Sequence, residues 1–177
     1  THLYDTDADR HSAGGNNADG QFFYGRRGAP TQWALAEALT QIEPGAYGTQ
    51  LYPSGVAAIA GCMLSVVKPG DRLLMADNAY DPSRCMATGL LTRMGVTTTF
   101  FDPRDLDAYA ALFADPVKAV WLENPGSLTF EVCDIPALAA IARQHGAVSM
   151  VDNTWASPLG FAALEHGCDI VMMSLSK

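Results

Sequence analysis

From residue 72 to residue 174, the chain alternates short apolar segments with segments of helical periodicity. The apolar segments have the length of strands and are RLLMADN (72–78), VTTTFFD (96–102), KAVWLEN (118–124), AVSMVDNT (147–154) and DIVMMS (169–174). The segments between them predict helices over 82–95, 104–113, 135–146 and 158–167. Strands separated by helices of this length need crossover connections. The alternation therefore predicts an α/β fold, a mostly parallel sheet with helices on both faces.

The first third of the chain is organised differently. The stretch up to about Gly20 is rich in Gly, Asn and Asp and shows no periodicity, so it predicts an extended arm or a loop. Helical spacing begins at residue 31 and predicts helices over 31–43 and 54–67, with a short strand over 49–54 between them. We therefore expect an arm over residues 1–29 and a domain over residues 30–177.

Composition limits the function classes. Hydrophobic residues make up 49% of the 177 residues, enough for one buried core. The net charge of -8 argues against a nucleic-acid surface, and no apolar run is long enough to span a bilayer. The four scattered cysteines are expected to be buried free thiols, and the four histidines lack metal-ligand spacing, so no metal site is expected. The default expectation is a soluble cytoplasmic protein.

Polar residues follow four of the predicted strands at the same position, where each strand ends. In open α/β sheets this carboxyl edge is where ligands bind. The residues brought there are Asn78 and Tyr80, Glu123 and Asn124, Asp152 and Asn153, and Ser174, Ser176 and Lys177. Four polar strand ends together indicate a binding site, in which we expect Glu123 and Asn124 to orient loops rather than to do chemistry.

A second feature is the Ser54-Gly55 pair that opens the small-residue helix predicted over 54–67. A hydroxyl, the free backbone N–H groups of Gly55 and Val56, and the positive end of the helix dipole form an anion site of the kind used for phosphates. A plain N-cap serine beside a glycine needed for packing is the alternative, and for this motif alone it is favoured. Neither a P-loop nor a GxGxxG motif is present, which disfavours nucleotides.

Pyridoxal 5'-phosphate (PLP) is a cofactor that needs all of these groups. A lysine amine forms a Schiff base with its aldehyde, a carboxylate keeps its pyridine nitrogen protonated, and an aromatic ring can stack on it. Asp152 precedes Lys177 by 25 positions, about one helix and one strand.

The motifs FYGRRGAPT, YPSGVAA, DNAYDPS, LENPGS, VDNTWASP and SLSK occur here in this order. Together they resemble the PLP-dependent enzymes of cysteine and methionine metabolism, the cystathionine lyases and synthases. The resemblance runs from Tyr24 to Lys177. It implies the aspartate-aminotransferase-like fold (PLP fold type I), of which this chain would be the N-terminal part of the large domain. The YGRRG and ENPGS versions are most similar to those of cystathionine β-lyases.

The resemblance also implies roles. Lys177 would be the Schiff-base lysine and proton shuttle, Asp152 would pair with the pyridine nitrogen, and Tyr80 would stack on the ring and take part in proton transfer. The phosphate would be held by Ser54, Gly55, Val56, Ser174 and Ser176. Tyr24 and Arg26 would reach the phosphate site of a neighbouring subunit, with Tyr24 also near the chemistry, so a homodimer or homotetramer is implied.

Departures from the family pattern matter as well. SLSK replaces the common Ser-x-Thr-Lys and keeps the hydroxyl at Ser176. Ser127 stands where the family often has a second Asn, which puts a cofactor contact in doubt and favours a β-lyase over a γ-lyase. Family chains continue past the position of Lys177 into a C-terminal domain, where the arginine for the substrate carboxylate is expected.

The implied activity is α,β-elimination of L-cystathionine, a small sulfur amino acid, to homocysteine, pyruvate and ammonia. Cystathionine γ-lyase, methionine γ-lyase or cystathionine γ-synthase activity on the same fold is the first alternative. A non-catalytic ligand-binding domain, or an inactive fragment, is the alternative from another class.

Overall fold

The computed structural model describes residues 5–13 and 28–177. The chain divides into two compact units. One contains α1 (Asp7–Ala13), α2 (Pro30–Ile42) and residues 46–51; the other comprises residues 43–45 and 52–177. The expected boundary between an arm and a domain at residue 29 remains a prediction.

The first unit differs from expectation in two places. A short helix, α1, lies in the stretch expected to be an arm without regular structure. Thr6 Oγ1 accepts the N–H of Asp9 at 3.1 Å, and the carboxylates of Asp7 and Asp9 in the first turn interact favourably with the helix dipole. These polar interactions stabilise a helix that has no apolar periodicity. The strand predicted over 49–54 is absent, because none of the described strands pairs with this segment.

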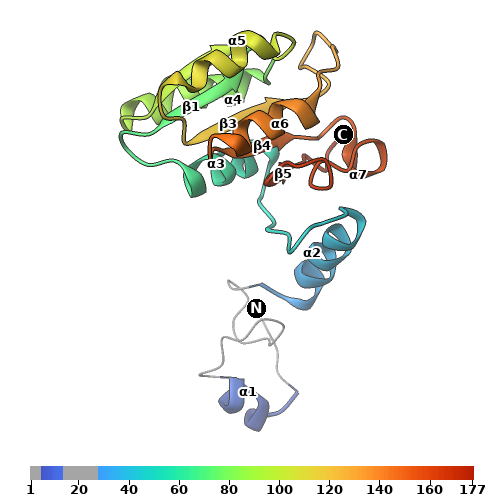
Figure 1. The fold of residues 1–177 in the computed structure, drawn as a ribbon. Coiled ribbons are helices and arrows are strands. Elements are labelled where there is room, and N and C mark those ends of the chain that lie inside the picture. Colours follow the sequence, from blue (N-terminus) through green and yellow to red (C-terminus); the bar gives the residue numbers. More distant parts are fainter. Residues whose placement is uncertain (1–4, 14–27) are drawn as a thin grey trace. The chain divides into compact units, whose positions relative to one another are not determined.

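The second unit contains a five-stranded parallel sheet of order β2-β1-β3-β4-β5 (Figure 1). The strands are β1 (Arg72–Ala76), β2 (Thr97–Phe101), β3 (Ala119–Glu123), β4 (Val148–Asp152) and β5 (Ile170–Met172). The helices are α3 (Gly55–Val66), α4 (Asp81–Met86), α5 (Leu106–Ala111), α6 (Ile135–Gln144) and α7 (Ser157–Gly160). The predicted mostly parallel sheet is confirmed.

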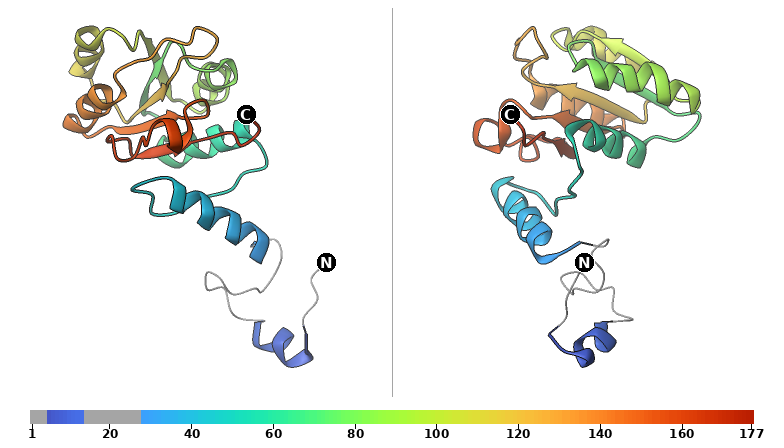
Figure 2. Two further views of the ribbon diagram at one scale, coloured as in Figure 1. Left: turned by 90° about the vertical axis from the view of Figure 1, so that its right-hand side faces the viewer. Right: turned by 180° about the vertical axis from the view of Figure 1, so that it is seen from behind.

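Helices cover both faces of the sheet (Figure 2). The side chains of the strands alternate between the two layers. Leu73 and Met75 of β1 belong to the cluster that includes Ile59 and Met63 of α3. Leu74 of β1 belongs to the opposite cluster, with α5 and α6. The sheet is therefore buried on both faces, as its apolar strand sequences require.

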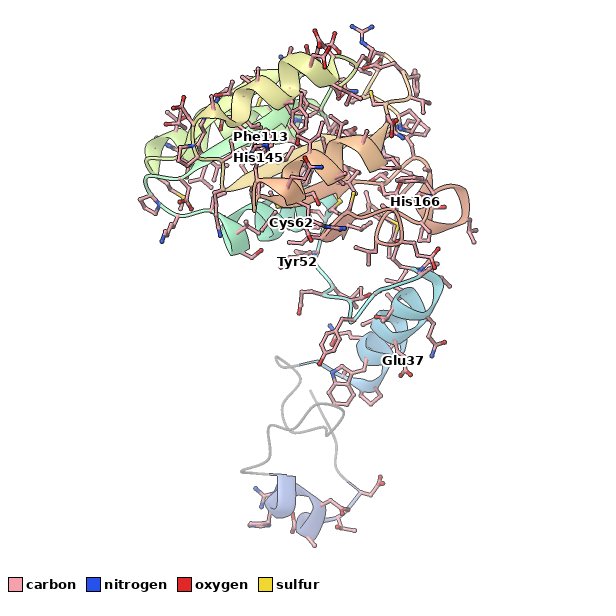
Figure 3. All side chains as sticks on the ribbon, in the orientation of Figure 1. Glu37, Tyr52, Cys62, Phe113, His145 and His166 are labelled. Carbon is pink, nitrogen blue, oxygen red and sulfur yellow. The ribbon has the colours of Figure 1, made fainter. Side chains whose placement is uncertain are left out.

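Aromatic rings fill the α5 and α6 side of the sheet. The Tyr109 ring stacks on Phe101 with centroids 4.5 Å apart, and its hydroxyl donates to Leu138 O at 3.2 Å. Phe113 lies between Tyr109 and His145, and its ring stacks on the imidazole with centroids 4.7 Å apart (Figure 3). The partnered phenol of Tyr109 explains how a Tyr side chain can be completely buried.

Two predicted helices end or change early. The helix expected over 82–95 is present over 81–93, but a π-helical turn, Ala87–Leu91, interrupts it after α4, and there the Thr92 hydroxyl donates to Ala87 O at 3.0 Å. The helix expected over 158–167 is only α7. Asn153 Nδ2 donates to Phe161 O at 2.8 Å, and Phe161 adopts an extended conformation that ends the helix.

The cysteines match their prediction only in part. All four are free thiols; Cys133 and Cys168 are buried, Cys62 is half-buried, and Cys85 is exposed on α4. Cys85 was therefore wrongly predicted as buried. Its helix follows a strand end, and the apolar neighbours in sequence do not show which side of a short helix faces the sheet.

Candidate active site

Two carboxylates lie side by side at the carboxyl edge of the sheet. Glu123 ends β3, Asp152 ends β4, and the two residues are direct register partners. Trp121 and Met150, two positions earlier, both face α3. Because side chains alternate along a strand, Glu123 and Asp152 also face α3.

The beginning of α3 lies next to the segment that follows β5. A Cβ atom at Gly55 would be 3.0 Å from Ser174 Cβ, so only glycine permits this approach without a shift. Ser54 is the N-cap of α3 and accepts the N–H of Ala57 at 3.2 Å, while the hydroxyls of Ser174 and Ser176 lie 2.9 Å apart. The hydroxyls of two segments thus gather around one helix N-terminus, and Gly55 permits their close approach. The phosphate role of these groups remains a prediction.

Thr154 connects the two parts of this site. Its Oγ1 accepts the N–H of Ser174 at 2.9 Å, and its own N–H donates to Asp152 Oδ1 at 3.0 Å. Sequence reasoning did not single out Thr154. The usable signal was a Thr two residues after a strand-end Asp, a spacing at which the Asp side chain bonds the backbone in an Asx turn.

The Asp152 carboxylate is buried, with 5% of the residue exposed. Burial raises its pKa, and the side-chain and backbone hydrogen bonds of Thr154 lower it. Within the described part of the chain it forms no ion pair. A buried carboxylate without a cation is costly, so this position suits a positively charged or protonated group of a ligand.

The charge of Asp152 also affects a thiol on α3. The pKa of the Cys62 thiol is raised to about 11, first by burial and then by the charge of Asp152. Figure 3 shows Cys62 on α3, the helix that covers this face of the sheet. The thiol therefore stays protonated beside the carboxylate.

Glu123 holds the loop after β1. Its Oε2 accepts the backbone N–H of Tyr80 at 2.6 Å. Asn124 acts similarly within its own loop, since its Oδ1 accepts the N–H of Cys133 at 2.8 Å. Both hydrogen bonds agree with the expectation that these residues orient loops. Tyr80, the N-cap residue of α4, has an exposed ring at this edge.

The loop that contains Ser127 is tied to the same edge by its backbone. The N–H of Ser127 donates to Asn78 O at 2.9 Å, so the residue lies beside the end of β1. The loss of a cofactor contact at Ser127 stays a prediction.

The remaining predicted residues are less closely linked. Val56 and Ser176 are exposed, and Lys177 is exposed without a hydrogen bond or ion pair to the other site residues in the described part of the chain. Tyr24 and Arg26 lie outside the described residues.

In residues 5–13 and 28–177 no group of three His, Cys, Asp or Glu side chains could hold a metal ion. Among the helices of the same residues, none has the length and apolar character needed to cross a membrane.

The fold and the site define a class: α/β proteins that bind a ligand at the carboxyl edge of a parallel sheet. The chain matches the family described as Cys/Met metabolism PLP-dependent enzyme over residues 1–177. It belongs to this family, which confirms the resemblance seen in its motifs.

Individual relatives show how mixed the family is. The chain is 42% identical over 165 residues to cystathionine beta-lyase MetC of Escherichia coli, covering 92% of this chain and 41% of that protein. A cystathionine gamma lyase structure from Micromonospora echinospora has a TM-score of 0.83 at 33% identity, over 92% of this chain and 43% of that one. This structural match, together with the parallel sheet, confirms the predicted PLP fold type I.

A third relative carries the cofactor. The structure of a Campylobacter jejuni protein assigned as an O-acetylhomoserine (thiol)-lyase contains N'-pyridoxyl-lysine-5'-monophosphate. It has a TM-score of 0.78 at 30% identity, over 84% of this chain and 37% of that one. This chain spans less than half the length of the curated relatives that it matches.

The residues present fit PLP. Asp152 offers a buried carboxylate without a cation in the described part of the chain, which suits a protonated pyridine nitrogen. The close approach of Gly55 to Ser174 brings hydroxyls and the start of a helix together, which suits a phosphate.

Proposed function

We propose that this chain is the PLP-binding part of a carbon–sulfur lyase that cleaves L-cystathionine by α,β-elimination to homocysteine, pyruvate and ammonia. One observation carries the proposal: Asp152, Ser174 and Gly55 meet on one face of one sheet edge. The relative named cystathionine beta-lyase and the ENPGS sequence support the β-lyase assignment.

The residues would share the work as follows. Asp152 would keep a proton on the pyridine nitrogen, and Ser54, Gly55, Val56, Ser174 and Ser176 would bind the phosphate. Tyr80 would lie against the ring, and Lys177 would bind the aldehyde through Nζ and take the α-proton of the substrate. When bound, PLP supplies an acceptor for the electrons released at the α-carbon.

The proposal includes a wider context. Residues 1–29 would form an arm that brings Tyr24 and Arg26 to a neighbouring subunit, residues 30–177 would form an incomplete PLP domain, and the assembly would be a homodimer or homotetramer. A cytoplasmic location suits such an activity.

Elimination at the γ-carbon is the second candidate. The similarity to a cystathionine gamma lyase and to an O-acetylhomoserine (thiol)-lyase supports this alternative. The two candidates differ in product, since α,β-elimination of cystathionine yields pyruvate and γ-elimination yields 2-oxobutyrate.

The test uses the full natural polypeptide incubated with pyridoxal phosphate. We expect visible absorbance from the bound cofactor and pyruvate formation from cystathionine. Lys177→Ala should abolish the visible band and lower kcat at least about 100-fold. This factor is the lower end of the range expected for the loss of a general acid–base group.

Lys118→Ala is the matched control, because Lys118 is exposed at the opposite edge of the sheet, just before β3, and should keep both signals. A wild-type protein that stays colourless with pyridoxal phosphate contradicts the proposal. A coloured protein that forms 2-oxobutyrate instead of pyruvate contradicts only the β-lyase assignment.

A further inference from the structure

Glu123 has no assigned role in binding or chemistry, yet it occupies a demanding place in the fold. All five residues of β3 are buried, and the first four are apolar, as expected for a central parallel strand. The fifth is Glu123, with 5% of the residue exposed. A carboxyl group in this position must be compensated by specific hydrogen bonds.

The compensation comes from one backbone group. The N–H of Tyr80 donates to Glu123 Oε2 at 2.6 Å, which is short for an N–H···O hydrogen bond. The bond joins the ends of β1 and β3, which are neighbours in the sheet although β2 lies between them in sequence. Here the order of the strands reverses, and the edge of an open sheet binds its ligands at such a point.

The bond holds the backbone from which the Tyr80 ring projects. Residue 80 is the N-cap of α4 and has no side-chain capping bond, and 41% of the residue is exposed. The backbone bond to Glu123 therefore helps to hold the start of this helix, together with the bond from Arg84 Nη1 to Asp77 O at 2.7 Å. Asp152, the register partner of Glu123, lies on the other side of it and faces the same layer.

The ionisation of Glu123 is consistent with this arrangement. Its pKa is raised to about 8, chiefly by burial and then by the charge of Asp152, whereas the N–H of Tyr80 lowers it. Two adjacent buried carboxyl groups without a cation in the described residues cannot both ionise at low cost. Oε2 can accept the N–H of Tyr80 with the proton on either Glu123 or Asp152.

We propose that Glu123 is a positioning residue that holds the Tyr80 backbone, and through it the Tyr80 ring, beside the cofactor site formed with Asp152. The inference rests on the proposed function, because the ring position matters only if PLP binds at this edge. Glu123 itself need not touch the cofactor.

The experiment compares Glu123→Gln, which keeps an acceptor oxygen, with Glu123→Met, which keeps the shape and removes the acceptor. The first measurement is the hydrogen exchange rate of the Tyr80 amide in the cofactor-free full polypeptide. Glu123→Met should raise the rate about 10-fold or more, the factor expected when a buried N–H loses its acceptor. Glu123→Gln should stay within about threefold of the wild type, because its carbonyl oxygen still accepts.

The second measurement is the visible circular dichroism of the protein loaded with pyridoxal phosphate, which reports the surroundings of the ring. Glu123→Met should lose at least half of the band per bound cofactor, and Glu123→Gln should restore it. Asp169→Ala is the matched control: Asp169 Oδ2 accepts the N–H of Ser149 at 2.8 Å at the opposite edge of the sheet. This control should leave the Tyr80 exchange rate and the band unchanged.

If Glu123→Met does not fold, Glu123→Asp decides, because it keeps the carboxyl group and withdraws it by one methylene. Unchanged exchange at Tyr80 in the folded variant overturns the inference, and so does faster exchange with an unchanged visible band. A wild-type protein without any visible band overturns the proposed function and the positioning role with it, whatever the exchange rates show.

Discussion

At the scale of single residues, the buried carboxyl of Glu123 should make stability depend on pH. Its pKa is raised from 4.5 to about 8 in the folded protein. Between these values the folded state keeps a proton that the unfolded state releases, so the free energy of unfolding falls as pH rises. The slope is at most about 1.4 kcal/mol per pH unit for one proton.

Glu123→Gln removes this proton and should therefore flatten the pH profile of the cofactor-free protein between pH 5 and pH 8. Urea unfolding at several pH values measures the effect. Glu37→Gln, at an exposed position of α2, should keep the wild-type slope. Equal slopes in the wild type and Glu123→Gln would show that Glu123 ionises normally.

At the scale of elements, the start of α3 packs against the segment after β5 through a glycine. A Cβ at Gly55 would be 3.0 Å from Ser174 Cβ and 3.1 Å from its Oγ, both tighter than ordinary contacts. Gly55→Ala should therefore separate the two segments slightly and lower stability by about 1 kcal/mol, the lower end of the cost of overpacking. Urea unfolding checks the value.

Gly89→Ala is the matched control, because no atom outside its own helical segment lies within 4 Å of the added Cβ. It should raise stability by about 0.5–1 kcal/mol, since alanine favours helical backbone. If Gly55→Ala were as stable as Gly89→Ala, the close approach of α3 to Ser174 would be wrong.

At the scale of the whole molecule, a single sheet separates two apolar clusters. Leu74 and Met75 are adjacent in β1, completely buried, and face opposite layers. Leu74→Ala and Met75→Ala should each lower the free energy of unfolding by about 2–5 kcal/mol. Far-UV and near-UV circular dichroism should report coincident transitions. Both helical layers pack on the same sheet, so one layer cannot unfold while the other stays folded.

Leu159→Ala serves as the control for this pair, since Leu159 is 90% exposed on α7, and it should change stability by less than about 0.5 kcal/mol. Separate transitions for the two variants would indicate that the two faces unfold independently.

Local sequence patterns were sufficient for the five strands and most of the helices, but they missed α1 and predicted a strand over 49–54 that does not form. Helical and strand periodicities depend on neighbours along the chain, so α3, α6 and the five strands could be predicted. The ordered motifs indicated the family. Cys85 and the early end of α7 could not be predicted, because burial and helix length there depend on contacts with distant residues.

Which strands are neighbours could only come from the tertiary structure. The pairing of β1 with β3 brings Tyr80 to Glu123, and the pairing of β3 with β4 places Glu123 beside Asp152. The link from Thr154 to Ser174 likewise spans 20 residues. No local periodicity encodes these contacts, because they arise from the order in which crossover connections place the strands. The amino-acid sequence determines which polar residues follow the strands. The order of the strands in the sheet determines which of these residues lie close enough to form a site.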